Sequence, residues 1–326
     1  MGTHGRGIWV LDHAEPLSQL TPEVLSGTGH AFPVPPAYHQ VIYPGQFWFG
    51  AGEFFAPNPP FGAVLTYYLP KVAGGGVQIA IADAAGKTIR TLRGPALAGL
   101  NRTCWDLRQA PAMPETGPAA MGNCTGGGGG GFGGGGRGGG GVGPLVLPGK
   151  YTVSVTPAGG PSLKTEVTVV PDPRWTLSDA DRNARHRAVM SAYTLEQQLI
   201  PARDAAQRVA EQAAAIRQYL VAAGAGASGA LAAAEKVVAL VGQAQGQVAR
   251  ALTGAGQAQG AMDGYGGLPT AAQLRQLDWA WEDALAGVSA LNQVIRQDMP
   301  SVYAAVGGAV HFPEVQPVAA PVRPAQ

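Results

Sequence analysis

The side chains that could carry out acid–base chemistry are scattered along this chain. A glycosidase needs two carboxyl groups about 5 to 10 Å apart, one of them with a raised pKa. The candidate carboxyl groups outside the predicted helices form no recognisable pair; they are Asp12, Glu15, Glu23, Glu53, Asp83, Asp106 and Glu115. His4 and His13 flank the first predicted strand and could meet a carboxylate, but histidines near turns are usually solvated. Because no nucleophile-elbow sequence occurs either, we expect no catalytic residue here.

Aromatic side chains gather in one stretch, which is the best candidate for ligand recognition. The segment YHQVIYPGQFWFGAGEFF contains Tyr38, Tyr43, Trp48 and Phe49. Exposed rings stack on sugar faces, whereas buried rings pack between domains and remove about 150 to 250 Å² each from water. We favour packing between domains and keep a glycan platform of these four residues as the alternative. Asp106 lies outside this stretch, and its expected role is a hydrogen bond in a turn or bulge.

Cysteines and glycines offer two weaker candidates. The chain has two cysteines, Cys104 and Cys124, and whether they pair is open. Zinc would need four ligands at set spacing, so we expect neither a metal nor a cofactor. The tract GGGGGGFGGGGRGGGG at 126–141 lacks the strand and helix of a phosphate loop, and a single Arg137 is too little for an RNA-binding segment. A flexible loop is the expectation, since ordering glycine costs much backbone entropy.

Composition excludes several classes of partner. The formal net charge is +1, and charged residues make up 13% of the chain, so we expect no binding to nucleic acid. No apolar run reaches the roughly 18 residues of a membrane span. The N-terminus has no basic start followed by an apolar stretch, so it predicts no signal peptide. The 49 glycines and 27 prolines indicate a loop-rich protein that selects partners by shape.

Hydrophobic alternation predicts strands in the first half of the chain. Residues 6–12 alternate with apolar side chains on both faces, which predicts a strand covered on both sides. Prolines in FPVPP and APNPPFG disfavour helix throughout residues 13–61. Beyond residue 62 a period of two recurs in GAVLTYYL, GVQIAIAD, KTIRTLR, LNRTCWDLR, GKYTVSVT and LKTEVTVV. These segments predict an antiparallel sandwich, in which the expected core includes Val77, Ile79, Trp105, Tyr151 and Val153.

From about residue 176 the period changes to that of helices. Ser178 with Asp181, and Thr270 with Gln273, are typical N-terminal caps. Three helices are predicted from the apolar positions Leu195, Leu199, Ala202, Ala206, Val209, Ala213, Ile216 and Leu220; Leu231, Val238, Val241, Val248 and Leu252 near 229–253; and Leu274, Leu277, Trp281, Ala284, Val288, Leu291 and Ile295. The pattern predicts an antiparallel bundle with an alanine-rich seam. Pro201 should kink the first helix.

Several strand motifs together resemble a known family. The stretch VQIAIADAAGKTIRTLRG, followed by AGLNRTCWDLR and GPLVLPGKYTVSVTPAGG, resembles the FlgD-type immunoglobulin-like domain. With THGRGIWVLD and NPPFGAVLTYYL before it and helices after it, the chain is similar to the C-terminal end of large bacterial proteins with BNR or sortilin-type β-propellers. Such proteins are described as glycosyl hydrolase-like or exo-sialidase-like.

The resemblance implies a multidomain chain with β and α parts. We expect the last propeller strand at 1–20, a connector at 21–61, an immunoglobulin-like sandwich at 62–175, a helical bundle at 176–305 and a disordered tail at 306–326. It also implies a secreted or periplasmic location. The expected function is a noncatalytic structural or association region, whose partner is its own propeller or another protein domain. A carbohydrate-binding module, and part of a glycoside hydrolase with its active site in the propeller, are the alternatives.

Overall fold

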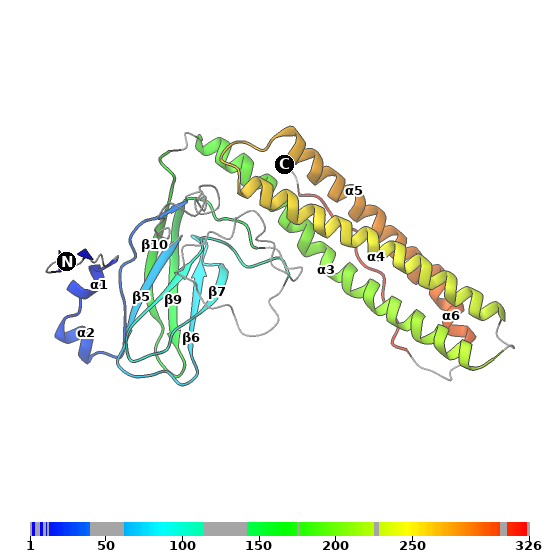
Figure 1. Cartoon of the computed structure of the whole chain (residues 1–326), viewed down its shortest axis with the longest axis horizontal. Helices are drawn as coiled ribbons and strands as arrows, with labels where there is room; N and C mark the ends of the chain where they lie inside the picture. Colours follow the sequence, from blue (N-terminus) through cyan, green and yellow to red (C-terminus); the bar gives the residue numbers. More distant parts are fainter. Residues whose placement is uncertain are drawn as a thin grey trace. The chain divides into compact units, whose positions relative to one another are not determined.

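The computed structural model describes residues 2–3, 7–8, 11, 13–39, 62–113, 142–174, 177–224, 228–306 and 312–324. The chain combines β-sheets with helices and divides into two compact units, Met1–Leu177 and Ser178–Gln326 (Figure 1). The first is called the strand unit and the second the helical unit. The sequence predicts this boundary after residue 175.

Two of the three sheets described in the strand unit, one of five strands and one of three, make up most of it. The larger has the order β4-β10-β9-β6-β7, with bounds Ala37–His39, Leu163–Pro171, Gly149–Pro157, Val77–Ala82 and Thr88–Gly94. The smaller has the order β3-β5-β8, with bounds His30–Ala31, Ala63–Leu69 and Gly99–Trp105. Every pairing among these strands is antiparallel except the parallel one between β10 and β4.

One hydrophobic core joins the two sheets. Inward residues of β5 and β8 belong to the same buried cluster as those of β6, β9 and β10. All five core residues that the sequence predicts are buried: Val77, Ile79, Trp105, Tyr151 and Val153. The rings of Trp105 and Tyr151 meet edge to face with centroids 5.3 Å apart. The strand pattern therefore identified the buried positions it named, four in the larger sheet and Trp105 in the smaller one.

The sheets begin earlier in the chain than predicted. The sequence assigns residues 21–61 to a connector, yet β3 and β4 pair with β5 and β10. Of the strand expected over 6–12, the structure describes Gly7 and Ile8, which form β2, Gly7–Ile8, and pair with β1, Gly2–Thr3, and it describes Leu11 outside any strand. Trp9 and Val10 lie outside the described residues.

Two short helices also occur where none was expected. They are α1, Glu15–Ser18, and α2, Pro22–Ser26. Pro16 and Pro22 stand in the first turn of these helices. Proline is tolerated there because the backbone N–H that it lacks would have no intrahelical partner in a first turn. The side chain of Thr21 also accepts a hydrogen bond from Val24 N at 3.4 Å. The expectation that proline disfavours helix throughout residues 13–61 was therefore wrong at 15–18 and 22–26.

The helical unit consists of three long helices and a short C-terminal one. They are α3, Asp179–Ala222; α4, Ser228–Asp263; α5, Ala271–Gln293; and α6, Met299–Ala305. Both predicted caps are present, because Ser178 accepts from Asp181 N and Thr270 forms a capping box with Gln273. Helix α3 continues through Pro201. Between α5 and α6 the π-helical turn η3, Val294–Asp298, precedes Pro300, which cannot continue the normal hydrogen-bond ladder.

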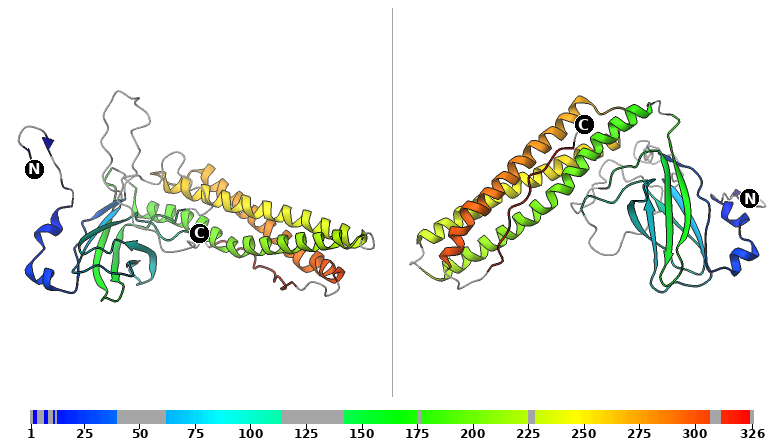
Figure 2. Two further views of the ribbon diagram at one scale, coloured as in Figure 1. Left: turned by 60° about the horizontal axis from the view of Figure 1, so that its bottom comes forward. Right: turned by 180° about the vertical axis from the view of Figure 1, so that it is seen from behind.

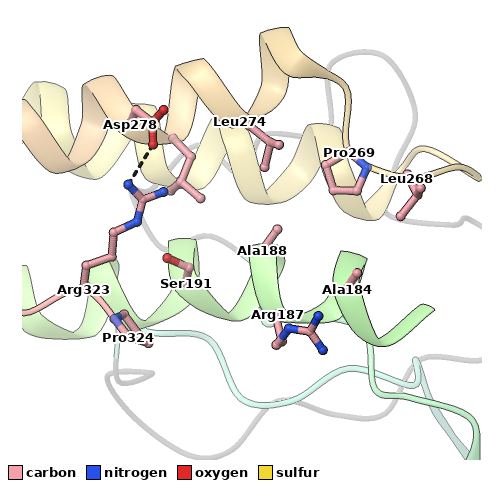
Figure 3. A pocket seen from close by; sticks show the side chains of 11 residues that line it. Ala184, Arg187, Ala188, Ser191, Leu268, Pro269, Leu274, Asp278, Arg323 and Pro324 are labelled. Atoms are coloured by element: carbon pink, nitrogen blue, oxygen red, sulfur yellow. Dashed lines mark ion pairs between the residues drawn. The ribbon is translucent and has the colours of Figure 1, made fainter. Parts of the chain in front are cut away.

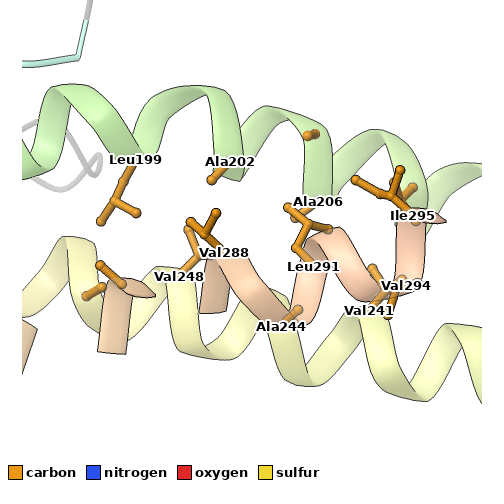
Figure 4. Close-up of a cluster of buried hydrophobic side chains, with 14 of the residues drawn as sticks. Leu199, Ala202, Ala206, Val241, Ala244, Val248, Val288, Leu291, Val294 and Ile295 are labelled. Carbon is orange, nitrogen blue, oxygen red and sulfur yellow. The ribbon is translucent and has the colours of Figure 1, made fainter. Parts of the chain in front are cut away.

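Small side chains line the core of the helical unit. Figure 4 shows residues of α3, α4 and α5 pointing toward one another, among them Leu199, Ala202 and Ala206; Val241, Ala244 and Val248; and Val288 and Leu291. The predicted positions on α3 are all buried. On α4 the predicted Leu231, Val238 and Leu252 are only partly buried, because an alanine-rich face with Ala234, Ala244 and Ala251 turns inward instead.

The C-terminal segment departs most from expectation. The sequence predicts disorder over 306–326, whereas residues 312–324 lie against the helical unit. Val315 is buried in the helical core, and Val318 exchanges two hydrogen bonds with the side chain of Asn292. Figure 2 shows this segment running lengthwise beside α3 and α5. Apolar contacts and hydrogen bonds to the helices offset the entropy lost by ordering it.

Candidate functional site

The aromatic platform predicted from the sequence is described at one of its four residues. Tyr38 stands on β4 with its side chain 48% exposed. Tyr43, Trp48 and Phe49 lie outside the described residues. The structure therefore offers an accessible ring at residue 38 and leaves the grouping of the four side chains as a prediction.

Polar residues of the strand motifs hold turns. Asp106 Oδ1 accepts a hydrogen bond from Arg108 N at 3.2 Å, which is the structural role expected for it. Asp83 Oδ1 accepts from the backbone N–H groups of Ala85 and Lys87, both at 3.0 Å. These carboxylates are engaged with the backbone of their own loops.

Three more side chains of the same motifs, one amide and two aromatic, also form hydrogen bonds with nearby backbone atoms. Asn101 is buried, and its side chain bonds to Leu97 N and O and to Gly99 O at 2.7 to 3.0 Å. Trp105 Nε1 donates to Arg108 O at 2.8 Å. Tyr151 OH donates to Leu147 O at 2.7 Å, and burial raises the pKa of this hydroxyl to about 12. Each polar atom thus fixes the local backbone.

Two further acidic candidates lie in short helices. Glu15 and Glu23 are exposed in the first turns of α1 and α2, and the pKa of Glu23 is lowered chiefly by its hydrogen bond with Thr21. Four more candidates, His4, Asp12, Glu53 and Glu115, lie outside the described residues. Within the described ranges, no three His, Cys, Asp or Glu side chains are grouped so as to hold a metal ion. Cys104 is disulfide-bonded, and the sequence holds one other cysteine, Cys124.

A pocket of about 410 Å³ opens in the helical unit. Its walls come from the N-terminal parts of α3 and α5, the loop between α4 and α5, and the end of the C-terminal segment (Figure 3). Ala184, Ala188 and Leu274 make the walls largely apolar. An ion pair closes one side, where Arg323 Nη1 lies 2.7 Å from Asp278 Oδ1. The arrangement suits binding of an apolar group more than a reaction.

Few signals in the sequence pointed to this pocket. Leu274 was predicted to lie in the helical core, but it is 39% exposed and lines the pocket. Ser191 also lines it, and its Oγ accepts a hydrogen bond from Trp281 Nε1 at 3.3 Å. Two of the lining residues, Arg323 and Pro324, belong to the segment expected to be disordered. A helical period identifies core faces but does not reveal a wall made by an irregular segment.

A buried carboxyl group is a second unexpected feature of the helical unit. Glu196 is 6% exposed, and its Oε1 has no hydrogen-bond partner. A Cβ atom placed on Gly256 of α4 would stand 3.3 Å from this oxygen, so the carboxyl group faces a gap left by glycine. Burial raises the pKa of Glu196 to about 7. Glu196 does not line the pocket described above, and we expect its protonation to affect the stability of the helical unit.

Among the described helices, none is both long and apolar enough to span a bilayer. Comparisons with protein families, curated proteins and solved structures find no match to this chain. The contacts of the described residues are therefore the basis for assigning a function.

Proposed function

We propose that this chain is a noncatalytic structural and association region of a secreted bacterial protein with a glycosyl hydrolase-like β-propeller. Its strand unit would serve as an immunoglobulin-like spacer and its helical unit as an antiparallel bundle. One observation carries the proposal: the polar side chains of the resembling motifs bond to nearby backbone. Asp83, Asn101 and Asp106 hold turns, which leaves the motifs a structural role.

The strand order supports an immunoglobulin-like sandwich. β3 belongs to the smaller sheet and the next strand, β4, belongs to the larger one. The segment that contains both strands therefore passes from one sheet to the other. Tyr151 stands near the start of β9 and bonds to the carbonyl of Leu147, four residues upstream. This contact is similar to the tyrosine corner of immunoglobulin-like domains.

The first test concerns the parent polypeptide. The coding sequence in frame upstream of Met1 should contain repeats that predict propeller blades, and a propeller expressed from them should copurify with residues 1–326 supplied as a separate chain. An upstream sequence without such repeats would overturn the propeller part of the proposal.

The second test addresses catalysis directly. The purified chain should hydrolyse none of a panel of aryl glycosides and sialosides above the uncatalysed rate. Asp106→Asn is the matched variant, because asparagine keeps an oxygen that can accept from Arg108 N while the carboxylate is removed. Turnover by the wild-type chain that this variant loses would show that the motif is catalytic.

A carbohydrate-binding module is the second candidate function, and the half-exposed ring of Tyr38 favours it. Trp48→Ala and Tyr43→Ala separate the two roles of the aromatic stretch. Platform residues would lose retention on immobilised glycans with an unchanged melting temperature. Packing residues would lower the melting temperature instead.

A further inference from the structure

The segment 312–324 meets the helical unit with a period of three. Phe312 and Val318 are partly buried, and Val315 and Pro321 are fully buried. Most residues between them are exposed, with Pro317 partly covered. Every third residue shares one face in a polyproline II helix, which has three residues per turn and no internal hydrogen bonds. The segment is therefore bound by one side, as a proline-rich ligand is.

Side-chain amides on the helices hold the backbone of this segment. Asn292 of α5 donates to Val318 O and accepts from Val318 N, both at 2.8 Å. Gln198 of α3 makes the same pair of bonds with Val322, at 3.1 and 2.7 Å. Gln212, also on α3, donates to Pro313 O at 2.9 Å. These hydrogen bonds are made to backbone atoms of an extended chain, so they do not depend on its side chains.

The two ends of the segment are held differently. At its start, the ring of Phe312 lies beside Tyr303 with centroids 6.5 Å apart, and the Tyr303 hydroxyl donates to Gln212. At its end, Arg323 pairs with Asp278 at the edge of the pocket (Figure 3). An apolar anchor, a series of backbone contacts and a terminal ion pair together specify both the direction and the register of a bound chain.

We infer that this surface, here called the tail-binding face and defined by Gln198, Gln212, Asp278 and Asn292, is a recognition site for an extended proline-rich peptide. Residues 312–324 occupy it as an intramolecular ligand. A partner protein would bind by presenting an extended segment with apolar residues at every third position and a basic residue after the last one. This inference does not require the propeller proposed above, because it depends on the helical unit alone.

The test removes the tail from the tail-binding face without changing a residue of that face. In the full chain, Val315→Glu together with Pro321→Glu places charges at the two buried positions of the tail and leaves every helix unchanged. A fluorescent peptide of residues 312–324 should bind this double variant at least tenfold more tightly than the wild-type chain. The reason is that the wild-type tail competes at an effective concentration in the millimolar range. Fluorescence anisotropy measures both affinities.

Two matched controls define the specificity. Adding Asn292→Ala to the double variant should weaken peptide binding about tenfold, because it removes two hydrogen bonds. Gln257→Ala removes an exposed amide on α4 and should leave binding unchanged. A peptide that exchanges Val315 with Gln316 and Ala320 with Pro321 keeps the composition and the N–H of Val322 that Gln198 accepts but breaks the period of three, and it should bind at least tenfold more weakly.

Hydrogen exchange on the wild-type chain gives an independent measurement if the double variant does not fold. Millimolar peptide should increase exchange at the amides of Val318 and Val322 while α3 and α5 stay protected. A folded double variant that binds no peptide, or equal binding of the rearranged peptide, would overturn the inference. Unchanged exchange in the wild-type chain would do so as well. Dimers of the wild-type chain that the double variant loses would assign the face to a second copy instead.

Discussion

The two units of this chain build their cores from different side chains. The strand unit buries large residues with polar atoms, such as Trp105 and Tyr67, and the Tyr67 hydroxyl donates to Pro95 O. The helical unit buries mainly alanine and valine, and α4 and α5 come so close that a Cβ on Gly287 would lie 3.0 Å from Gln247 Cβ. Stability is thus concentrated in a few strand-unit residues and spread over many positions in the helices.

The largest expected effect lies at the most concentrated point. Trp105→Ala should lower the free energy of unfolding of the strand unit by about 3 to 5 kcal/mol, because it empties a large core site. Denaturant unfolding followed by circular dichroism measures the loss. Leu100→Ala, at an exposed position of the same strand, is the control and should change stability by less than about 1 kcal/mol. An unchanged midpoint for Trp105→Ala would contradict the core assignment.

The helical unit should depend on pH through Glu196. Its folded pKa of about 7 lies above the ordinary value of 4.5. The stability linked to its protonated form is therefore fully present below pH 4.5 and is lost as the pH rises through 7. The loss should reach about 3 kcal/mol at high pH, at about 1.36 kcal/mol per pKa unit. Thermal melts between pH 5 and pH 8.5 measure it.

Glu196→Gln should remove this pH dependence, because glutamine stays neutral. Glu235→Gln, at an exposed position of α4, should keep it. Both variants keep His186 of α3, whose pKa burial lowers, so that its contribution cancels in the comparison. A wild-type melting temperature that rises between pH 5.5 and pH 8.5 would contradict the assignment.

Overpacking tests the small-residue core. Ala244→Leu should destabilise the helical unit by about 1 to 3 kcal/mol, because α4 has no room for added methylenes between α3 and α5. Figure 4 places Ala244 among these helices. Ala249→Leu, at an exposed position of α4, is the control and should be nearly neutral. Equal stability of the two variants in urea would show that the seam is loosely packed.

Local periods predicted much of what regular packing decides. Alternation identified Val77, Ile79 and Val153, and the capping signals located the starts of α3 and α5. The face of α4 was misjudged because large aliphatic residues were expected inside, whereas close approach of helices favours alanine. No template for helix or strand contains the period of three that docks residues 312–324. The pocket depends on that segment, so it could not be predicted either.

The smallest expected effect lies at the start of α5, where the helical unit depends on one polar cap and not on its core. Thr270 Oγ1 accepts from Gln273 N at 3.2 Å, and Gln273 Oε1 accepts from Thr270 N at 2.8 Å. Thr270→Ala should lower stability by about 1 kcal/mol, since it leaves a first-turn N–H without its partner. Thr270→Ser keeps the hydroxyl and should be nearly neutral. Equal melting temperatures for the two variants would mean that core packing alone fixes this end of the helix.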